Sequence, residues 1–135
     1  MTLQYSVAVR NARLDAVEST TGSSAILCIR SGAPPANCGT ADSGTVLATL
    51  NLPSDWMSAA SSGSKALLGS WQDTSADAAG TAGHFRIYDS AGTTCHVQGT
   101  VTATGGGGDM TVDNTSIAAG QQVTVTGFTL TAGNA

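Results

Sequence analysis

The stretch GHFRIYDSAGTTCHVQGTV, from Gly83 to Val101, carries the clearest local pattern in the chain. Apolar and polar residues alternate with a period of two on both sides of Asp89–Gly92, a run typical of a tight turn. One face of the pattern holds Phe85 and Ile87 before the turn, and Cys95, Val97, Gly99 and Val101 after it. The stretch therefore predicts a β-hairpin. It contains both histidines of the chain, His84 and His96, which we expect to be polar strand residues that face solvent or a partner.

The rest of the chain predicts further short strands joined by polar loops. Gly-rich, charge-poor sequence with many Thr residues suits strands and turns, because β-branched side chains pack well on a pleated surface. Strands are expected over residues 25–31, 45–52, 65–71, 109–117 and 121–131. We expect surface loops over residues 32–44 and 72–83, and a flexible hairpin tip at the glycine tract 105–108. The pattern indicates a single all-β domain over residues 1–135.

The last predicted strand contains a change of register. Val123 and Val125 share one face, whereas Phe128 and Leu130 have the opposite parity. All four can point inward only if one extra residue is absorbed near Gly127. We therefore predict a β-bulge there.

Residues 4–19 form the one good helix candidate. Thr2 is a plausible N-cap and Gly22 a plausible stop. Five residues fall at helical spacing and predict its packing face: Tyr5, Ala8, Val9, Ala12 and Ala16. So short a helix is marginal alone. It is expected to dock either on the sheet of its own chain or on a neighbouring subunit.

Composition excludes several classes of partner. The net charge is −4, and no Lys or Arg follows Arg86, so the basic footprint of a nucleic-acid-binding protein is missing. The longest apolar run, residues 25–29, is far too short for a membrane span, and the first residues lack the apolar core of a secretory signal. Three cysteines without such a signal indicate reduced thiols in a cytoplasm. A lean apolar core favours stabilisation by a partner.

No sequence motif indicates catalysis or metal binding. The spacings of common zinc sites and the nucleophile elbow of hydrolases are both missing. We therefore expect no enzyme activity, no catalytic residues, no metal and no cofactor. The two tryptophans, Trp56 and Trp71, either anchor a partner or stack on a sugar, or they plug the ends of a small sandwich. As candidate partner-interface residues we take Trp56, Met57 and Trp71.

Five segments resemble a group of small bacteriophage and prophage virion proteins. They are LQYSVAVRNARLDAVE (3–18), ANCGTADSGTVLATLNLPSDWM (36–57), TAGHFRIYDSAGTTCHVQGTV (81–101), GGGGDM (105–110) and FTLTAGNA (128–135). The functional analogue that the resemblance suggests is the capsid cement, or decoration, protein of tailed phages, as in a Bordetella podophage.

This resemblance implies a jelly-roll-like antiparallel β-sandwich over residues 25–131, with one N-terminal α-helix over residues 4–19. It implies a homo-oligomer, a dimer or a trimer, that is assembled in the host cytoplasm. On the capsid exterior it would bind and stabilise the shell of major capsid protein. The alternative is a phage tail or fibre module that binds host glycan or other tail proteins, which predicts an exposed Trp56 or Trp71 beside a groove. A small hydrolase, a third reading, predicts His84 or His96 in a pocket beside an acid.

Overall fold

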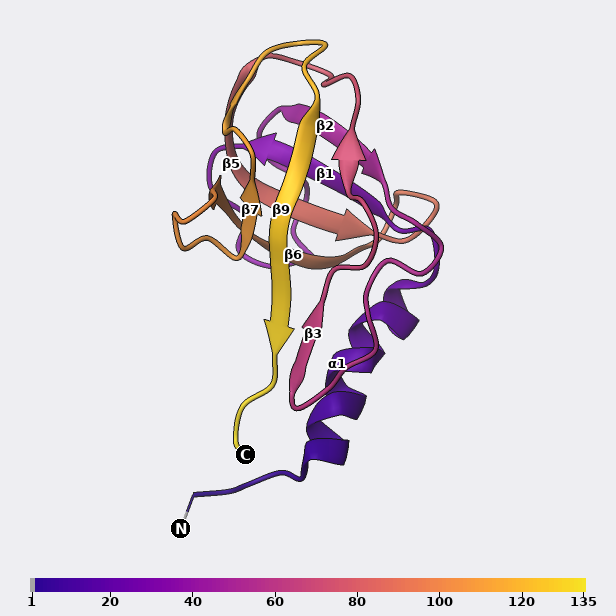
Figure 1. Cartoon of the computed structure of the whole chain (residues 1–135). Coiled ribbons are helices and arrows are strands. Elements are labelled where there is room, and N and C mark those ends of the chain that lie inside the picture. Colours follow the sequence, from indigo (N-terminus) through magenta and orange to yellow (C-terminus); the bar gives the residue numbers. More distant parts are fainter. Residues whose placement is uncertain (1) are drawn as a thin grey trace.

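The computed structural model describes residues 2–135, so Met1, the first residue of the predicted domain, lies outside the described range. These residues form a mainly β structure in which one helix lies beside a curled sheet (Figure 1). The elements are α1 (Val7–Thr21), β1 (Ile26–Ser31), β2 (Val46–Asn51), β3 (Ser64–Ala66), β4 (Gln72–Asp73), β5 (Gly80–Tyr88), β6 (Cys95–Ala103), β7 (Met110–Val112), β8 (Ser116–Ile117) and β9 (Val123–Thr131). The helix and the β-rich body were both predicted.

The strands follow one another around the curl in the order β2-β1-β5-β6-β7-β9-β3, while β4 also pairs with β9 and β8 with β5. The curl brings β5 and β9 face to face. The rings of Phe85 and Phe128, one from each strand, lie 5.5 Å apart in an edge-on contact. It also brings the chain after β4 back to β2, where the amide of Asp77 donates to the carbonyl of Leu47 at 2.8 Å. The core lies inside the curl.

The central hairpin is confirmed. β5 and β6 pair antiparallel, and Phe85 and Ile87 are buried on the inner face. The register shifts between Ile87 and Tyr88, so that Tyr88 faces Cys95 and His96 is the extra residue. His84 was expected to face solvent or a partner, and this is wrong. It is fully buried under the loop that follows β1, with Nδ1 2.8 Å from the carbonyl oxygen of Gly32.

The β-bulge in β9 is also confirmed. Thr111 of β7 pairs with Gly127, whereas the next residue, Val112, pairs with Val125. Thr126 is therefore the extra residue, and it is exposed. The inserted residue lets Val125 and Phe128 both point into the core.

The glycine tract differs from its prediction. β6 and β7 run parallel, so residues 105–108 are not a hairpin tip. They carry the chain back along the end of β6, close to Thr102. A Cβ at Gly106 or Gly108 would lie 2.7 or 2.9 Å from side-chain atoms of Thr102. Glycine is needed here because the two backbone segments approach too closely for a side chain.

Three other predicted segments are shortened, divided or replaced by strands. The strand expected over 65–71 is shortened to β3, and the one expected over 109–117 is divided into β7 and β8. The surface loop expected over 72–83 instead contains β4 and the start of β5, and its Ala76 is buried. Of these short strands, β3 and β4 pair with β9, β7 pairs with β6 and β9, and β8 pairs with the start of β5.

Candidate interaction surface on the N-terminal helix

Helix α1 begins later than predicted. Ser6, not Thr2, is its N-cap, and the Ser6 hydroxyl accepts a hydrogen bond from the amide of Val9 at 3.2 Å. The preceding residues run along the C-terminal segment, where the amide of Tyr5 donates to the carbonyl of Asn134 at 2.6 Å. Gly22, with φ of +95°, ends the helix as predicted.

The helix docks on its own chain, but through the opposite face to the one predicted. Ala8, Val9, Ala12 and Ala16 are exposed. The inward side holds one buried leucine, Leu14, together with a set of polar residues that bond to the segment 56–66. These polar residues are Arg10, Asn11, Asp15 and Glu18.

A buried lysine is the centre of this docking. Lys65 of β3 is 2% exposed, and its Nζ atom lies 2.9 Å from Asp15, 3.1 Å from Glu18 and 2.8 Å from the carbonyl oxygen of Ser58. A lysine so deeply buried needs compensating charge. The two helix carboxylates supply it, and this fixes the rotation of α1 about its axis.

The same helix side chains satisfy backbone groups of the irregular segment 56–63, which precedes β3. A carboxylate oxygen of Glu18 accepts from the amides of Trp56 and Met57, at 3.0 and 2.9 Å. The Asn11 side chain accepts from the amide of Gly63 at 2.9 Å. Buried amides outside regular pairing need such acceptors. This requirement explains why the polar side of α1 faces inward.

The ionisation of the network follows from these contacts. Burial opposes the charge on Glu18, but the hydrogen bonds from Met57 and Lys65 outweigh it and lower its pKa. The hydrogen bond from Lys65 lowers the pKa of Asp15. Asp55 is hydrogen-bonded to Glu18, and this raises its pKa. Burial also opposes the charge on Lys65, yet the two carboxylates raise its pKa overall.

The outward side of α1 is partly apolar and, apart from Arg13, uncharged. Its large exposed apolar side chain is Val9, which is 44% exposed and lies beside the small residues Ala12 and Ala16. The nearest cation, Arg13, is folded over the ring of Tyr5 at 5.2 Å from its centroid. We call Val9, Ala12 and Ala16, with their neighbours on this side, the outer helix face.

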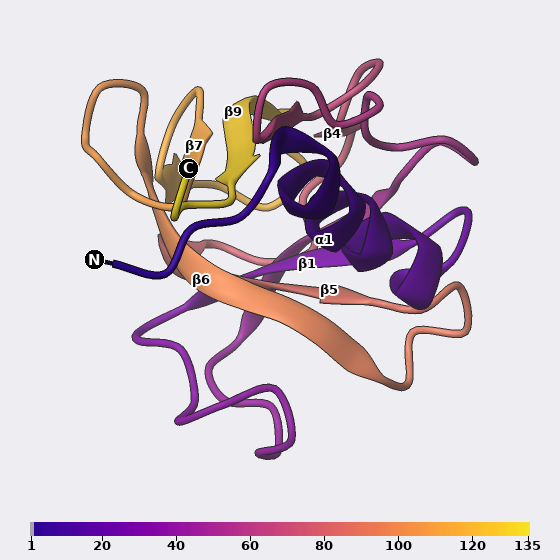
Figure 2. The same cartoon turned by 90° about the horizontal axis from the view of Figure 1, so that it is seen from below.

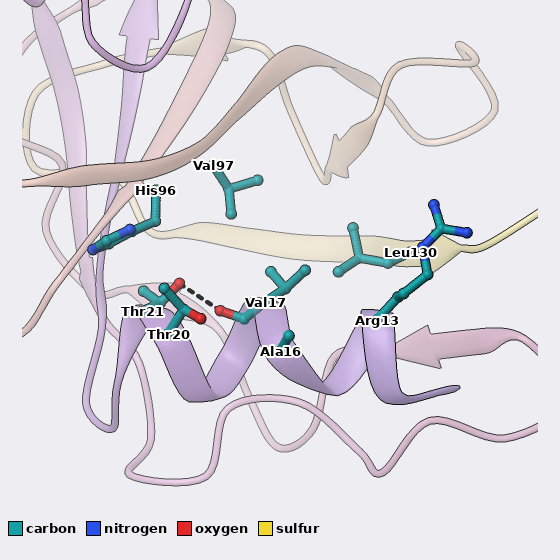
Figure 3. A pocket seen from close by; sticks show the side chains of 8 residues that line it. All are labelled: Arg13, Ala16, Val17, Thr20, Thr21, His96, Val97 and Leu130. Atoms are coloured by element: carbon teal, nitrogen blue, oxygen red, sulfur yellow. Dashed lines mark hydrogen bonds between the residues drawn. The ribbon is translucent and has the colours of Figure 1, made fainter. Parts of the chain in front are cut away.

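A groove runs beside the outer helix face, between α1 and the strands β6 and β9 (Figure 3). Its volume is about 430 Å³. Val17, Val97 and Leu130 give it an apolar floor, while Arg13 and His96 are its ionisable residues. No carboxylate is among the described residues that line it. Figure 2, the whole chain seen from below, shows α1 and the long ribbon of β6.

Trp56, Met57 and Trp71, predicted as partner-interface residues, lie in the core of the chain and are at most 1% exposed. The Trp56 indole donates to the carbonyl of Gly22 at 2.9 Å, and that of Trp71 to the carbonyl of Trp56 at 3.1 Å. Trp71 also packs against Phe128 at 5.5 Å. The interface prediction is corrected for these three residues, because they close the core beneath α1.

Among residues 2–135, no cluster of three or more His, Cys, Asp or Glu side chains is arranged to hold a metal ion. The 15-residue α1 is too short and too polar to span a bilayer. Sequence reasoning missed the Lys65 network, because Asp15, Glu18 and Lys65 are far apart in the chain. The lone lysine of a charge-poor chain was the one available signal.

Comparisons with known proteins found no matching family model, no matching curated protein and no matching solved structure.

Proposed function

We propose that this chain is a structural protein of a tailed-phage virion, a capsid cement protein that binds the outer surface of the capsid shell. In this proposal the curled sheet is a jelly-roll-like sandwich that serves as a rigid body. Its many weak contacts with the shell are multiplied by the symmetry of the particle. The sequence resemblance to small virion proteins supports the proposal.

The outer helix face is the observation that carries the proposal. The chain pairs the carboxylates of α1 internally and leaves partly apolar residues outside that, apart from Arg13, carry no charge. Interface cores are depleted in charged residues in the same way. Val9 and Ala12 present a surface on which a partner can pack closely without desolvating a charge.

The distribution of charge agrees with this role. The net charge is −4, which disfavours contact with packaged DNA. Close packing of copies on a shell demands that the contact face itself be neutral, because like charges brought together repel. The outer helix face meets this demand.

The test is co-sedimentation of the purified chain with expanded, empty capsids of the phage that encodes it. Ala12→Lys places a charge in the outer helix face and keeps helix propensity. We expect it to reduce binding at least tenfold. Ala119→Lys, at an exposed turn, is the matched control and should bind as the parent chain does. Equal binding by both variants would show that the outer helix face is not the contact.

The tail or fibre alternative differs in copy number. Densitometry of purified particles should show a cement protein at a level near that of the major capsid protein. The glycan-binding form of the alternative predicted an exposed Trp56 or Trp71, and both are buried. A few copies per particle would favour a tail location bound through other tail proteins.

A further inference from the structure

Two arginines hold the long loop between β1 and β2, residues 32–44. Arg30 pairs with Asp42 at 3.1 Å, and Arg86 makes most of the contacts. Arg86 of β5 is 2% exposed, and its Nη2 atom donates to the carbonyl oxygens of Asn37, Cys38 and Thr40, at 3.1, 3.0 and 3.0 Å. Its Nη1 atom pairs with Asp42. This arginine therefore fixes the loop over the outer face of the central hairpin.

A second contact fixes the loop over the neighbouring strand. The side chain of Gln98, which faces Arg86 across the hairpin, donates to the carbonyl oxygen of Pro35 at 2.7 Å. Tyr88, on the same face, donates to Asp42 at 2.6 Å. The loop thus covers the part of the hairpin where Tyr88 pairs with Cys95.

Two cysteines belong to this covered face. Cys95 faces Tyr88, so its side chain lies under the loop. Cys38 lies in the loop over the same face, where its carbonyl oxygen accepts from Arg86 at 3.0 Å. All three cysteines of the chain are free and partly buried. Cys28 lies on β1, where it faces Thr49 and Arg86, and is the remaining thiol.

We propose that Cys38 and Cys95 are a disulfide-forming pair, which closes when the protein meets a small-molecule disulfide such as oxidised glutathione. The thiolate of Cys38 attacks one sulfur of the oxidant and releases one glutathione thiolate. The thiolate of Cys95 then attacks the Cys38 sulfur of the mixed disulfide and releases the second glutathione. Two protein thiols are oxidised, one glutathione disulfide is reduced, and both thiol protons pass to the glutathione thiolates.

The order of the two steps follows from the surroundings of Cys95. Burial and the neighbouring thiol raise the pKa of Cys95 to about 11, so at neutral pH it is a poor first nucleophile. Once Cys38 carries a glutathione, its activated sulfur lies beside Cys95. The second step is then intramolecular and gains from proximity.

The disulfide ties the arginine-held loop covalently to β6. It encloses residues 38–95 and restricts the unfolded chain, which stabilises the folded state. A reducing cytoplasm would keep the pair open and an oxidising exterior would close it. Only this timing rests on the proposed virion function, since the chemistry depends on the two thiols alone.

Incubation of the full chain with oxidised glutathione, followed by mass spectrometry and peptide mapping, tests the pair. We expect the protein to lose the mass of two hydrogen atoms, to retain one of its three free thiols, and to yield a linked Cys38–Cys95 peptide. The melting temperature should rise by about 10 °C.

Three variants separate the outcomes. Cys28→Ser should form the same link with the same rise in melting temperature. Cys38→Ser and Cys95→Ser should end as mixed disulfides or stay reduced, without that rise. Stable glutathione adducts on the parent chain with no internal link, or a link that includes Cys28, would overturn the proposal. These readouts need no capsid, so they are independent of the test of the proposed function.

Discussion

The Nζ atom of Lys65 lies 3.1 Å from a carboxylate oxygen of Glu18, although only 2% of the lysine side chain is exposed. This ion pair joins β3 to α1 and determines which side of the helix faces the body. Helices of globular proteins usually bury an apolar stripe. Here the buried side is ionic, and the more apolar side stays exposed.

The pair should be strongly coupled in stability. We expect Lys65→Ala to lower the free energy of unfolding by about 3 kcal/mol, because it leaves a carboxylate partly buried without its cation. The double variant Lys65→Met, Glu18→Gln should recover part of this loss, since the glutamine keeps an acceptor for the amide of Met57. Urea denaturation of Lys65→Met, of Glu18→Gln and of the double variant measures the coupling. Additive effects would contradict the assigned role.

Stability should fall in acid through this network. The folded-state pKa values of Glu18 and Asp15 lie below their ordinary values, so their contributions are present above about pH 4.5 and are lost as the pH falls through the lowered pKa values. The pKa of Lys65 is raised. Its contribution to stability is therefore complete at pH values below its ordinary pKa and is lost only in strong alkali. Helix docking should therefore weaken below about pH 4.5.

Asp55 acts in the opposite direction. Its hydrogen bond to Glu18 raises its pKa, so its ionisation at neutral pH is unfavourable in the folded state. We expect Asp55→Asn to cause no loss of unfolding free energy at pH 7. In this variant the free energy of unfolding should fall more steeply as the pH drops. Lys65→Met should show a shallower fall of stability in acid than the parent chain. Circular dichroism of thermal unfolding between pH 2.5 and 7 measures both variants. An identical fall of stability in acid in all three proteins would contradict this assignment.

Arg86→Lys should release the loop over residues 32–44. An ammonium group cannot reproduce the planar set of donors that reaches the carbonyl oxygens of Asn37, Cys38 and Thr40. We expect faster amide hydrogen exchange across this loop and a loss of about 2–4 kcal/mol in unfolding free energy. Arg13→Lys, at the edge of the groove, is the control and should leave the exchange of the loop unchanged.

Gly83→Ala should be severely destabilising. A Cβ at this position would collide with the backbone of Gly32. Backbone atoms cannot yield as a flexible side chain can, so we expect a loss of more than about 3 kcal/mol. Gly133→Ala, which has open space around it, should change stability by less than about 0.5 kcal/mol. Equal melting temperatures of the two variants would show that β5 can shift away from Gly32.

Local patterns predicted local structure well. The alternation around Asp89–Gly92 predicted the hairpin, and the parity change between Val125 and Phe128 predicted the bulge. Both predictions depend on side-chain direction along a strand, which the sequence states directly. The parallel pairing of β6 with β7 was not predictable in this way, because a glycine tract fits a return loop as well as a hairpin tip.

The candidate site was predicted less well, for a physical reason. Helical spacing marked Ala8, Val9 and Ala12 as the packing face, on the rule that apolar sides go inward. The rule failed because the segment 56–66 offers amides and a buried lysine, which demand carboxylates and amide oxygens. The same rule, applied to Trp56 and Trp71, allowed either a core or an interface, and the structure selects the core.

The hydrogen bond between the Tyr5 amide and the Asn134 carbonyl has a practical consequence. The two chain ends lie together, so a short glycine linker could join them and new ends could be opened in an exposed turn such as Asp89–Gly92. A circular permutant of this kind would present α1 inside a continuous backbone.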